Sequence, residues 1–391
     1  MEQFKEFEKR IKETKTNVFV YGTLTGLSAV KRFFARHTTL SYSLKRISIG
    51  LACLFVGLSI VFLLVRWQTD TDAFLPAVSQ KFNWTPEQNQ MYLKAKLEPL
   101  GLWGSLWDQL WKYWYNIFPL IPKTIPDHVV FNERTGDIIS STYKTYFVYL
   151  GISVSKAVGQ DYPVNKLFAE GIPYSFAFGI IAVVLSYAIS LPLGIYSAMK
   201  KQNVSGKVIN ATTILIYCLP TVIVTLVLFI IPVIGLSESR MFLSGSFWSK
   251  FWPELTLVVL FVPVNLIMVR RYFVEESYSE YVRFAMAKGV SENNLYFKHI
   301  FRNTSAVILR SLPMEIAGAI FGASLVVETQ WGIPGIGNLV ANSLSVDSTD
   351  PLVIVAYITL SGVTTTFAAL FSDLLMVALD PRVKLKGGKH S

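Results

Sequence analysis

Six long apolar segments dominate this chain of 391 residues and decide what it can fold into. A helix needs about 20 mainly apolar residues to cross the hydrocarbon core of a bilayer. Only 16% of all residues are charged, whereas soluble domains usually contain about a quarter. The sequence therefore predicts an all-α integral membrane protein with six transmembrane helices, of which the fourth is the shortest. The segments are roughly 47–65, 174–199, 208–235, 255–269, 306–327 and 352–379.

The placement of lysine and arginine predicts how these helices are oriented. Residues 1–46 contain ten, 200–207 three, 270–305 six, and the tail after 379 four. The connection 236–254 contains two, and 328–351 contains none. Because cytoplasmic connections carry the excess of Lys and Arg, we expect a multi-pass plasma-membrane protein with both termini in the cytoplasm. The net charge of +10 is then a topology signal, and nucleic-acid binding is not expected.

The topology divides the chain into a cytoplasmic segment, 1–46, a first helix, 47–66, and an insertion, 67–173. A five-helix core, 174–383, follows, with a cytoplasmic loop at 270–305 and a tail at 384–391. The insertion contains nine Lys/Arg and ten Asp/Glu. Long segments are exempt from the positive-inside rule, so we expect a large extracytoplasmic insertion between the first and second helices. Within it, the proline-rich stretch 119–137 is predicted to be a loop.

Four tryptophans in the insertion follow a helical spacing. Trp103, Trp107, Trp111 and Trp114 are separated by four, four and three residues, which places them on one stripe of a helix. Tryptophan prefers the membrane–water interface, so a helix that lies at the outer surface or packs on the spans is the favoured interpretation. A platform for an external partner protein is the alternative.

Residues for catalysis are missing. There is no G-x-x-x-x-G-K-[ST] phosphate loop and no His-Glu-x-x-His pair. Cys53 and Cys218 both lie in apolar runs, which indicates neither a disulfide framework nor a metal site. We therefore expect no enzyme activity and no cofactor on this chain.

Three ionisable residues occur within the predicted spans. Arg310 and Asp373 fall toward the cytoplasmic ends of their helices, where snorkelling or mutual pairing is the ordinary explanation. Glu315 lies roughly 14 Å further along an ideal helix than residue 306 and is expected to face protein or water. Gly318 and Gly322 form a small-xxx-small pattern, which predicts helix packing or a lining of the transport pathway.

The cytoplasmic loop carries the signals of two short helices joined by a tight turn. Tyr278, Val282 and Ala285 are spaced as one apolar helix face. Gly289 suits a left-handed C-cap position, and Ser291 can cap the next helix. Val290 and Leu295 have the spacing of a hydrophobic staple. Because Ala285 and Ala287 are small, another protein could approach closely, and a docking element is predicted.

This loop resembles a known family. The stretch "YVRFAMAKG", residues 281–289, with His299, Arg302 and Asn303 after it, is similar to the coupling loop of permease subunits of binding-protein-dependent ABC importers. The general consensus is Glu-Ala-Ala, three residues, Gly, nine residues and Ile-x-Leu-Pro. Only Ala285 and Gly289 fit it, and Arg302 stands where proline is expected. The form Tyr-Val-Arg-x-Ala-x-Ala-Lys-Gly is that of the peptide and nickel branch, and it includes Tyr281, Val282, Arg283, Ala287 and Lys288 here.

Other stretches resemble the same branch, namely "VVETQWGIPGIGNLV", Asp350-Pro351 and the closing "SDLLMVALDPRVK". The resemblance implies a type I ABC importer permease that pairs with a second, similar permease. It further implies two ATPase subunits, which would hold ATP and magnesium, and an extracytoplasmic solute-binding protein. The implied substrate is an oligopeptide or dipeptide, with nickel and sugar-derived solutes left open. An ion-coupled secondary transporter and a membrane scaffold without transport remain alternatives.

Overall fold

The chain folds into a long bundle of helices with one β-hairpin. The computed structural model describes residues 38–69, 71–132, 138–155, 158–159, 162–239, 241–345 and 349–379. Most of the expected segment 1–46, the whole tail 384–391 and the residues Asp380 to Arg382 lie outside the described residues. The larger helices are α2 (Thr38–Gln68), α4 (Pro86–Leu100), α5 (Leu106–Ile117), α6 (Val164–Met199), α7 (Val204–Cys218), α8 (Thr221–Ile230), α9 (Phe247–Glu276), α12 (Phe301–Gly318) and α15 (Pro351–Leu379).

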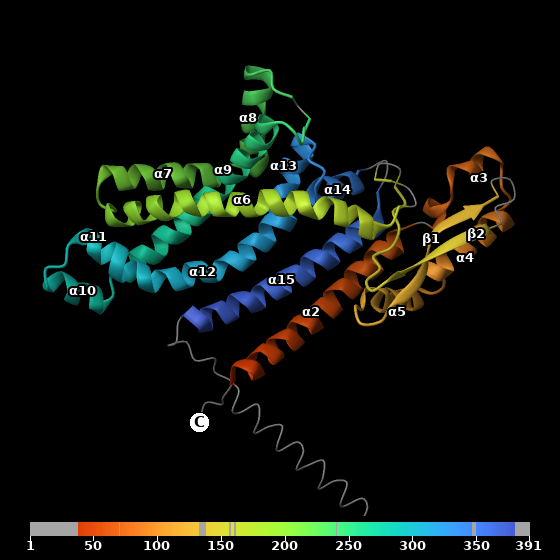
Figure 1. Cartoon of the computed structure of the whole chain (residues 1–391), viewed down its shortest axis with the longest axis horizontal. Helices are drawn as coiled ribbons and strands as arrows, with labels where there is room; N and C mark the ends of the chain where they lie inside the picture. The colour runs from red at the N-terminus through yellow and green to blue at the C-terminus, as the bar shows by residue number, and fades with distance from the viewer. Residues whose placement is uncertain are drawn as a thin grey trace, which may run out of the picture.

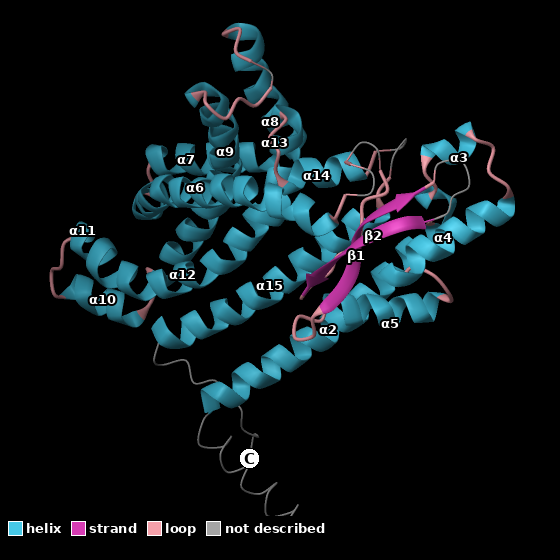
Figure 2. Ribbon diagram, turned by 45° about the vertical axis from the view of Figure 1, so that its right-hand side comes forward, coloured by secondary structure: helices cyan, strands magenta, loops and turns pink. Residues whose placement is uncertain are grey.

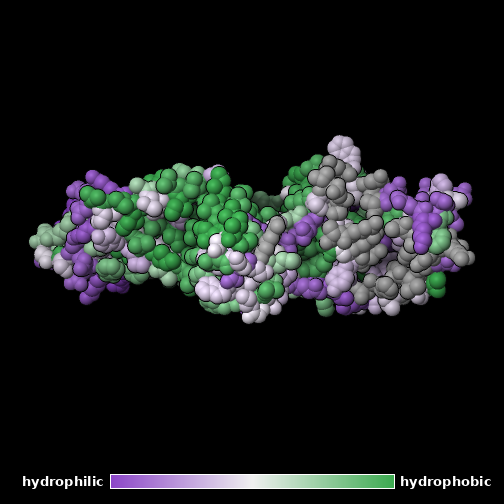
Figure 3. Space-filling view, turned by 90° about the horizontal axis from the view of Figure 1, so that it is seen from above, coloured by the Kyte–Doolittle hydropathy of each residue, from purple (hydrophilic) through white to green (hydrophobic). Residues whose placement is uncertain are grey.

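Shorter elements connect the long helices and occupy the two ends of the bundle. At one end lie α10 (Glu280–Ala287) and α11 (Glu292–Asn294), and at the other lie the elements of the insertion (Figure 1). Hydrophobic residues cover much of the middle, and hydrophilic residues gather toward the two ends (Figure 3). The remaining elements are η1 (Thr71–Phe74), α3 (Ala77–Lys81), β1 (Lys123–Phe131), β2 (Ile138–Tyr146), α13 (Ser324–Trp331), α14 (Ile336–Ser343) and the π-helical turns η2 (Ile231–Gly235), η3 (Leu295–Ile300) and η4 (Ala319–Ala323).

Five helices of the described chain are long and apolar enough to cross a membrane. The predicted span 208–235 differs, because it consists of α7 followed by α8 and η2, with a bend of 98° between them. Pro220 accounts for the bend: the residue before a proline disfavours the helical conformation, and Leu219 is extended with ψ of 137°. The count is six only if this bent pair is one span. The five helices are Ser43–Trp67 within α2, α6, α9, the run Glu292–Trp331 and α15.

The fourth predicted span is longer than expected. Helix α9 covers 30 residues rather than the predicted 255–269, because the helix continues through an aromatic-rich stretch before the apolar run and a charged stretch after it. It packs along α6 at close range. A Cβ added at Gly194 of α6 would lie 2.7 Å from Cγ1 of Val269 on α9, so only glycine permits this approach. These two helices form the centre of the bundle.

The insertion contains helices and the β-hairpin of β1 and β2 (Figure 2). The stretch 119–137 was predicted to be a loop, which is wrong for the residues of β1, since β1 pairs antiparallel with β2. Pro126 is tolerated because both strands of a two-stranded sheet are edges, and the register shifts directly after it. The segment before α6 is fastened to α15 through Asp350, which is fully buried. Its carboxylate accepts hydrogen bonds from the Ser153 hydroxyl at 2.6 Å and from the Val353 amide at 3.2 Å.

The four tryptophans of the predicted stripe lie in two different environments. Trp103 precedes the start of α5 and packs against the buried cluster of the insertion. On α5, the Trp114 ring lies 4.7 Å from that of Phe55 on α2, and its Nε1 donates to Ser59 at 3.0 Å. Trp107 and Trp111 are each 65% exposed. Helix α5 therefore packs on the first span, as the favoured interpretation expected, and leaves two tryptophans on its outer face.

Candidate functional site: a helical hairpin at one end of the bundle

Helices α10 and α11 form a hairpin whose turn follows from one glycine. Gly289 has φ of +77°, a conformation that side chains with a Cβ rarely adopt. Its amide donates to the carbonyl of Met286 at 2.9 Å, and the Val290 amide donates to that of Ala285 at 3.2 Å. This pair of hydrogen bonds is the Schellman motif, which ends α10 and reverses the chain. The predicted helix, tight turn and helix are present in the structure.

The inner side of the hairpin is fixed in the core of the bundle. Val282 and Leu295 are almost fully buried, together with Ile300, which follows in η3. They pack in one cluster with Val269 and Phe273 of α9 and with residues of α6. Val290 packs against the same cluster, as expected for the staple with Leu295. Because this side is buried, the hairpin has to move together with the helices that hold it.

Polar contacts fix the hairpin further. Oε1 of Glu276, at the end of α9, accepts hydrogen bonds from the Tyr281 hydroxyl at 2.8 Å and the Asn303 amide at 3.1 Å. Burial and the hydrogen bond to Glu276 raise the pKa of Tyr281, which keeps this hydroxyl protonated as a donor. An ion pair of 3.0 Å joins Lys200, after α6, to Glu292 of α11. The hairpin is thus tied to the ends of both central helices.

The outer side of the hairpin is exposed and carries large apolar side chains among positive charges. Phe284 is 63% exposed, Met286 52% and Phe297 56%. The Lys288 ammonium lies 4.4 Å from the centre of the Phe284 ring. Large apolar side chains that are exposed beside charged ones favour a protein–protein contact at this end of the bundle. Of the other residues predicted for this loop, the exposed ones are Arg283, Ala287, Gly289, Ser291, His299, Arg302 and Asn303.

Three details of the predicted site differ in the structure. Tyr278 does not share the apolar face of Val282; it is 60% exposed, with the Lys201 ammonium 4.2 Å from its ring centre. Ser291 occupies the N-cap position with extended backbone, but its side chain makes no capping hydrogen bond. Ala285 is partly buried against the chain's own core, so it does not leave room for a partner. The exposed small residue is Ala287.

The residues predicted for packing or a pathway lie on α12 and η4. Glu315 faces protein, since its Oε1 accepts a hydrogen bond of 2.6 Å from the Tyr187 hydroxyl. Gly318 and Gly322 are exposed, and a Cβ at either would meet nothing within 4 Å. They therefore pack against no helix within the described chain. The close approach in this region is instead between Gly179 and Ala319, where a Cβ added at Gly179 would lie 3.3 Å from that of Ala319.

The sequence reasoning did not single out Glu328, which is 1% exposed and organises the other end of the bundle. Its Oε1 accepts a hydrogen bond of 2.7 Å from Ser175, and its Oε2 accepts one of 2.6 Å from the Gly337 amide. The available signal was a carboxylate in an apolar helix, followed at once by the helix-breaking sequence "WGIPGIG".

Comparison with known proteins identifies a family that the chain matches and several related proteins. Residues 190–385, half of the chain, match the family described as binding-protein-dependent transport system inner membrane component. The oligopeptide transport system permease protein AmiC of Streptococcus pneumoniae is 32% identical over 262 residues, which cover 65% of this chain and 52% of that protein. The chain thus spans about half the length of this relative.

A second relative is matched over more of its own length. The dipeptide transport system permease protein DppB of Lactococcus lactis is 27% identical over 274 residues, which cover 68% of this chain and 88% of that protein. Among solved structures, the MetNI methionine ABC transporter in an inward-facing conformation has a chain that superposes with a TM-score of 0.47 at 13% identity. The superposition covers 55% of this chain and 97% of the transporter chain.

Proposed function

We propose that this chain, which belongs to the family of binding-protein-dependent transport system inner membrane components, is a permease subunit of an ATP-driven peptide importer. With a second, similar permease it forms the pathway through which peptides cross the membrane. The related oligopeptide and dipeptide permeases support the choice of peptides as substrate.

The observation that carries the proposal is the two-sided hairpin of α10 and α11. Val282 and Leu295 hold it in the core between α6 and α9, whereas Phe284 and Met286 present an apolar surface outward. A subunit that binds Phe284 and moves would therefore move α6 and α9 with it. This is the mechanical requirement for an ATPase that drives a permease. ATP and magnesium belong to that partner, since this chain has no phosphate loop.

The pathway lies along the exposed face of α12 and η4. Met314, Gly318 and Gly322 share this face, and the two glycines leave open space beside the helix. A second permease facing it would enclose a channel, rather than a packed interface, at these positions. Glu315 lies next to this face and is held by Tyr187, so its carboxylate is placed to meet a polar solute.

The proposed topology has six spans, with the bent pair α7 and α8 as one broken span. Both termini and the hairpin are cytoplasmic, and the insertion 67–173 is outside, where it meets the solute-binding protein. The alternation of Lys and Arg supports this orientation. No observation on the described residues favours an ion-coupled transporter or a scaffold.

The test removes the exposed apolar contact without touching the core. Phe284→Ser should weaken co-purification of the ATPase subunits and lower peptide uptake into vesicles. Phe147→Ser is the matched control for ATPase co-purification, which it should leave normal, because Phe147 is 64% exposed and lies directly after β2 in the insertion. Losing a well-packed aromatic from an interface costs about 2 kcal/mol, or roughly thirty-fold in affinity. Normal attachment and uptake in Phe284→Ser would refute a docking role for the hairpin.

A further inference from the structure

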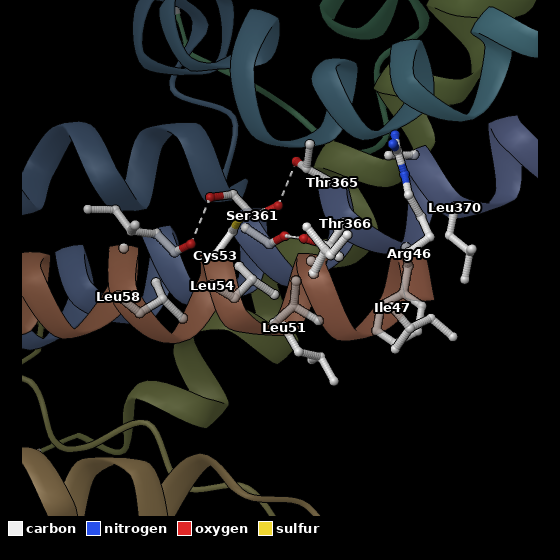
Figure 4. Close-up of a pocket in the computed structure, with 18 of the residues that line it drawn as sticks. Arg46, Ile47, Leu51, Cys53, Leu54, Leu58, Ser361, Thr365, Thr366 and Leu370 are labelled. Carbon is white, nitrogen blue, oxygen red and sulfur yellow. Dashed lines mark hydrogen bonds between the residues drawn. The ribbon is translucent and has the colours of Figure 1, made fainter. Parts of the chain in front are cut away.

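A cavity of about 660 Å³ lies between α2 and α15 (Figure 4). The two helices approach closely at two glycines: a Cβ at Gly50 would lie 2.7 Å from Thr366, and one at Gly362 would lie 2.9 Å from Leu54. Beside these contacts the small side chains leave a hollow, and a Cβ at Gly57 would meet nothing within 4 Å. The cavity therefore forms because the contacts at Gly50 and Gly362 keep the two spans from approaching further, and the small residues beside these contacts do not fill the space between them.

The walls of this cavity suit a hydrocarbon chain. The hydroxyl groups that line it, from Ser361, Thr365 and Thr366, each donate to a carbonyl of α15 itself, at 3.1, 2.7 and 2.8 Å. Their hydrogens are therefore already used within the helix. Most of the remaining lining is aliphatic, including Leu51 and Leu58. A peptide or sugar would lose its hydrogen bonds to water here, whereas an acyl chain has none to lose.

Among the described residues, positive charge exceeds negative charge at one end of the cavity. Nε of Arg46, which lines the cavity, is 3.0 Å from Oδ2 of Asp373, and a terminal nitrogen of Arg310 is 3.2 Å from Oδ1. The pairing expected for Arg310 and Asp373 is thus present, but two guanidinium groups share one carboxylate. The side chains of Arg46 and Arg310 are 50% and 47% exposed.

Arg46 lies at the depth in the bilayer at which lipid phosphates are found. Arg66 lies 20 residues further along α2, which is about 30 Å on an ideal helix and equals the thickness of the hydrocarbon core. Arg46 therefore lies at one surface of the hydrocarbon, where phospholipid phosphates begin.

We propose that this cavity is a binding site for an anionic phospholipid, with an acyl chain between α2 and α15 and the phosphate at Arg46. The charge favours this occupant over an apolar helix of another subunit, which would bring nothing to compensate the excess guanidinium. Basic sites between spans are where anionic headgroups bind. The site does not depend on transport or on the proposed orientation.

The experiment measures lipid binding to the purified full-length chain in detergent by native mass spectrometry. Phosphatidylglycerol and phosphatidylcholine with the same acyl chains are titrated separately. We expect phosphatidylglycerol to bind more tightly, by about five-fold for one well-placed arginine. Arg46→Gln should remove this preference, and Gly57→Leu, which fills the cavity, should weaken both lipids. Val56→Leu is the matched control, because Val56 is 56% exposed and does not line the cavity.

Three results would contradict the proposed lipid-binding site. They are equal affinity for the two lipids, a preference that survives Arg46→Gln, and lipid that is displaced when the other transporter subunits assemble with the chain. The last result would assign the cavity to a protein partner. Thermal unfolding of each variant identifies a misfolded protein, and Gly57→Leu tests the cavity independently of the charge cluster.

Discussion

The hydroxyl of Ser175 on α6 donates a hydrogen bond of 2.7 Å to Oε1 of Glu328 on α13, which joins two helices inside the protein. The same hydroxyl accepts a hydrogen bond of 2.8 Å from the Ile336 amide. Glu328 Oε2 accepts one from the Gly337 amide at 2.6 Å. Ser175 and Glu328 together satisfy the first amides of α14, which have no partner within their own helix. The short helix α14 is thereby held against the N-terminal half of α6.

Removing the carboxylate should destabilise this end of the bundle. Glu328→Ala leaves buried amides without acceptors, and we expect the free energy of unfolding to fall by more than about 2 kcal/mol. Ser175→Ala should cost about 1–2 kcal/mol. Thermal unfolding in detergent measures both. Ser48→Ala is the control, since the Ser48 hydroxyl also binds a helix carbonyl but is exposed. Equal stability of Glu328→Ala and Ser48→Ala would contradict the role of the carboxylate.

The three tryptophans of α5 should differ in their effects: Trp114 stabilises the fold, whereas Trp107 and Trp111 act at the surface. Trp114→Ala removes the contacts with Phe55 and Ser59 and should lower the free energy of unfolding by about 2 kcal/mol, less than a fully buried tryptophan would cost. Trp107→Ala and Trp111→Ala should leave unfolding unchanged. We expect these two to weaken contact with the membrane interface or the solute-binding protein, measured as binding-protein affinity, with ATPase assembly intact. If all three variants behave alike, the division is wrong.

The sequence predicted the features that depend on neighbours along the chain. Apolar length predicted six spans, and five of them are long helices in the described chain. Gly289 predicted the turn of the hairpin, because the φ that one residue can adopt decides it. The bend at Pro220 was missed because the apolar run continues through it. The strand β1 was missed because proline and polar residues resemble a loop, and only its pairing with β2, which begins seven residues after β1 ends, makes it a strand.

Long-range partners were beyond sequence reasoning. Ser175 and Glu328 are 153 residues apart, and nothing in either segment identifies the other. Ala285 and Ala287 have the same side chain, two residues apart, and only the packing of the core decides which of them is exposed. The two-helix hairpin could therefore be predicted from sequence, but which of its residues are exposed could not.

Accessibility from the two sides of the membrane tests the proposed topology. In a chain with Cys53 and Cys218 replaced by serine, Asn132→Cys should react with an impermeant maleimide added outside intact cells. Asn132 is exposed and lies just after β1. Lys288→Cys, in the hairpin, should react only after the membrane is opened. Labelling of Asn132→Cys from the cytoplasmic side alone would show that the orientation is the reverse of the proposed one.

The turn of the hairpin offers a test that depends on backbone conformation alone. A Cβ at Gly289 meets nothing within 4 Å, so a substitution there causes no steric clash with neighbouring atoms. Its effect comes from φ of +77°, which costs a β-branched residue about 1–2 kcal/mol and asparagine much less. Gly289→Val should therefore deform the turn, whereas Gly289→Asn should keep it.

The two variants together distinguish a shaped docking surface from a simple connector. Gly289→Val should reduce ATPase co-purification or uncouple ATP hydrolysis from peptide uptake, because Phe284 and Met286 would no longer be held at the same angle. Gly289→Asn should behave as the unmodified chain. Membrane insertion and pairing with the second permease should be normal in both, since the turn lies outside the predicted spans. Wild-type uptake and full attachment in Gly289→Val would show that the shape of the turn does not matter, and the hairpin would lose its mechanical role.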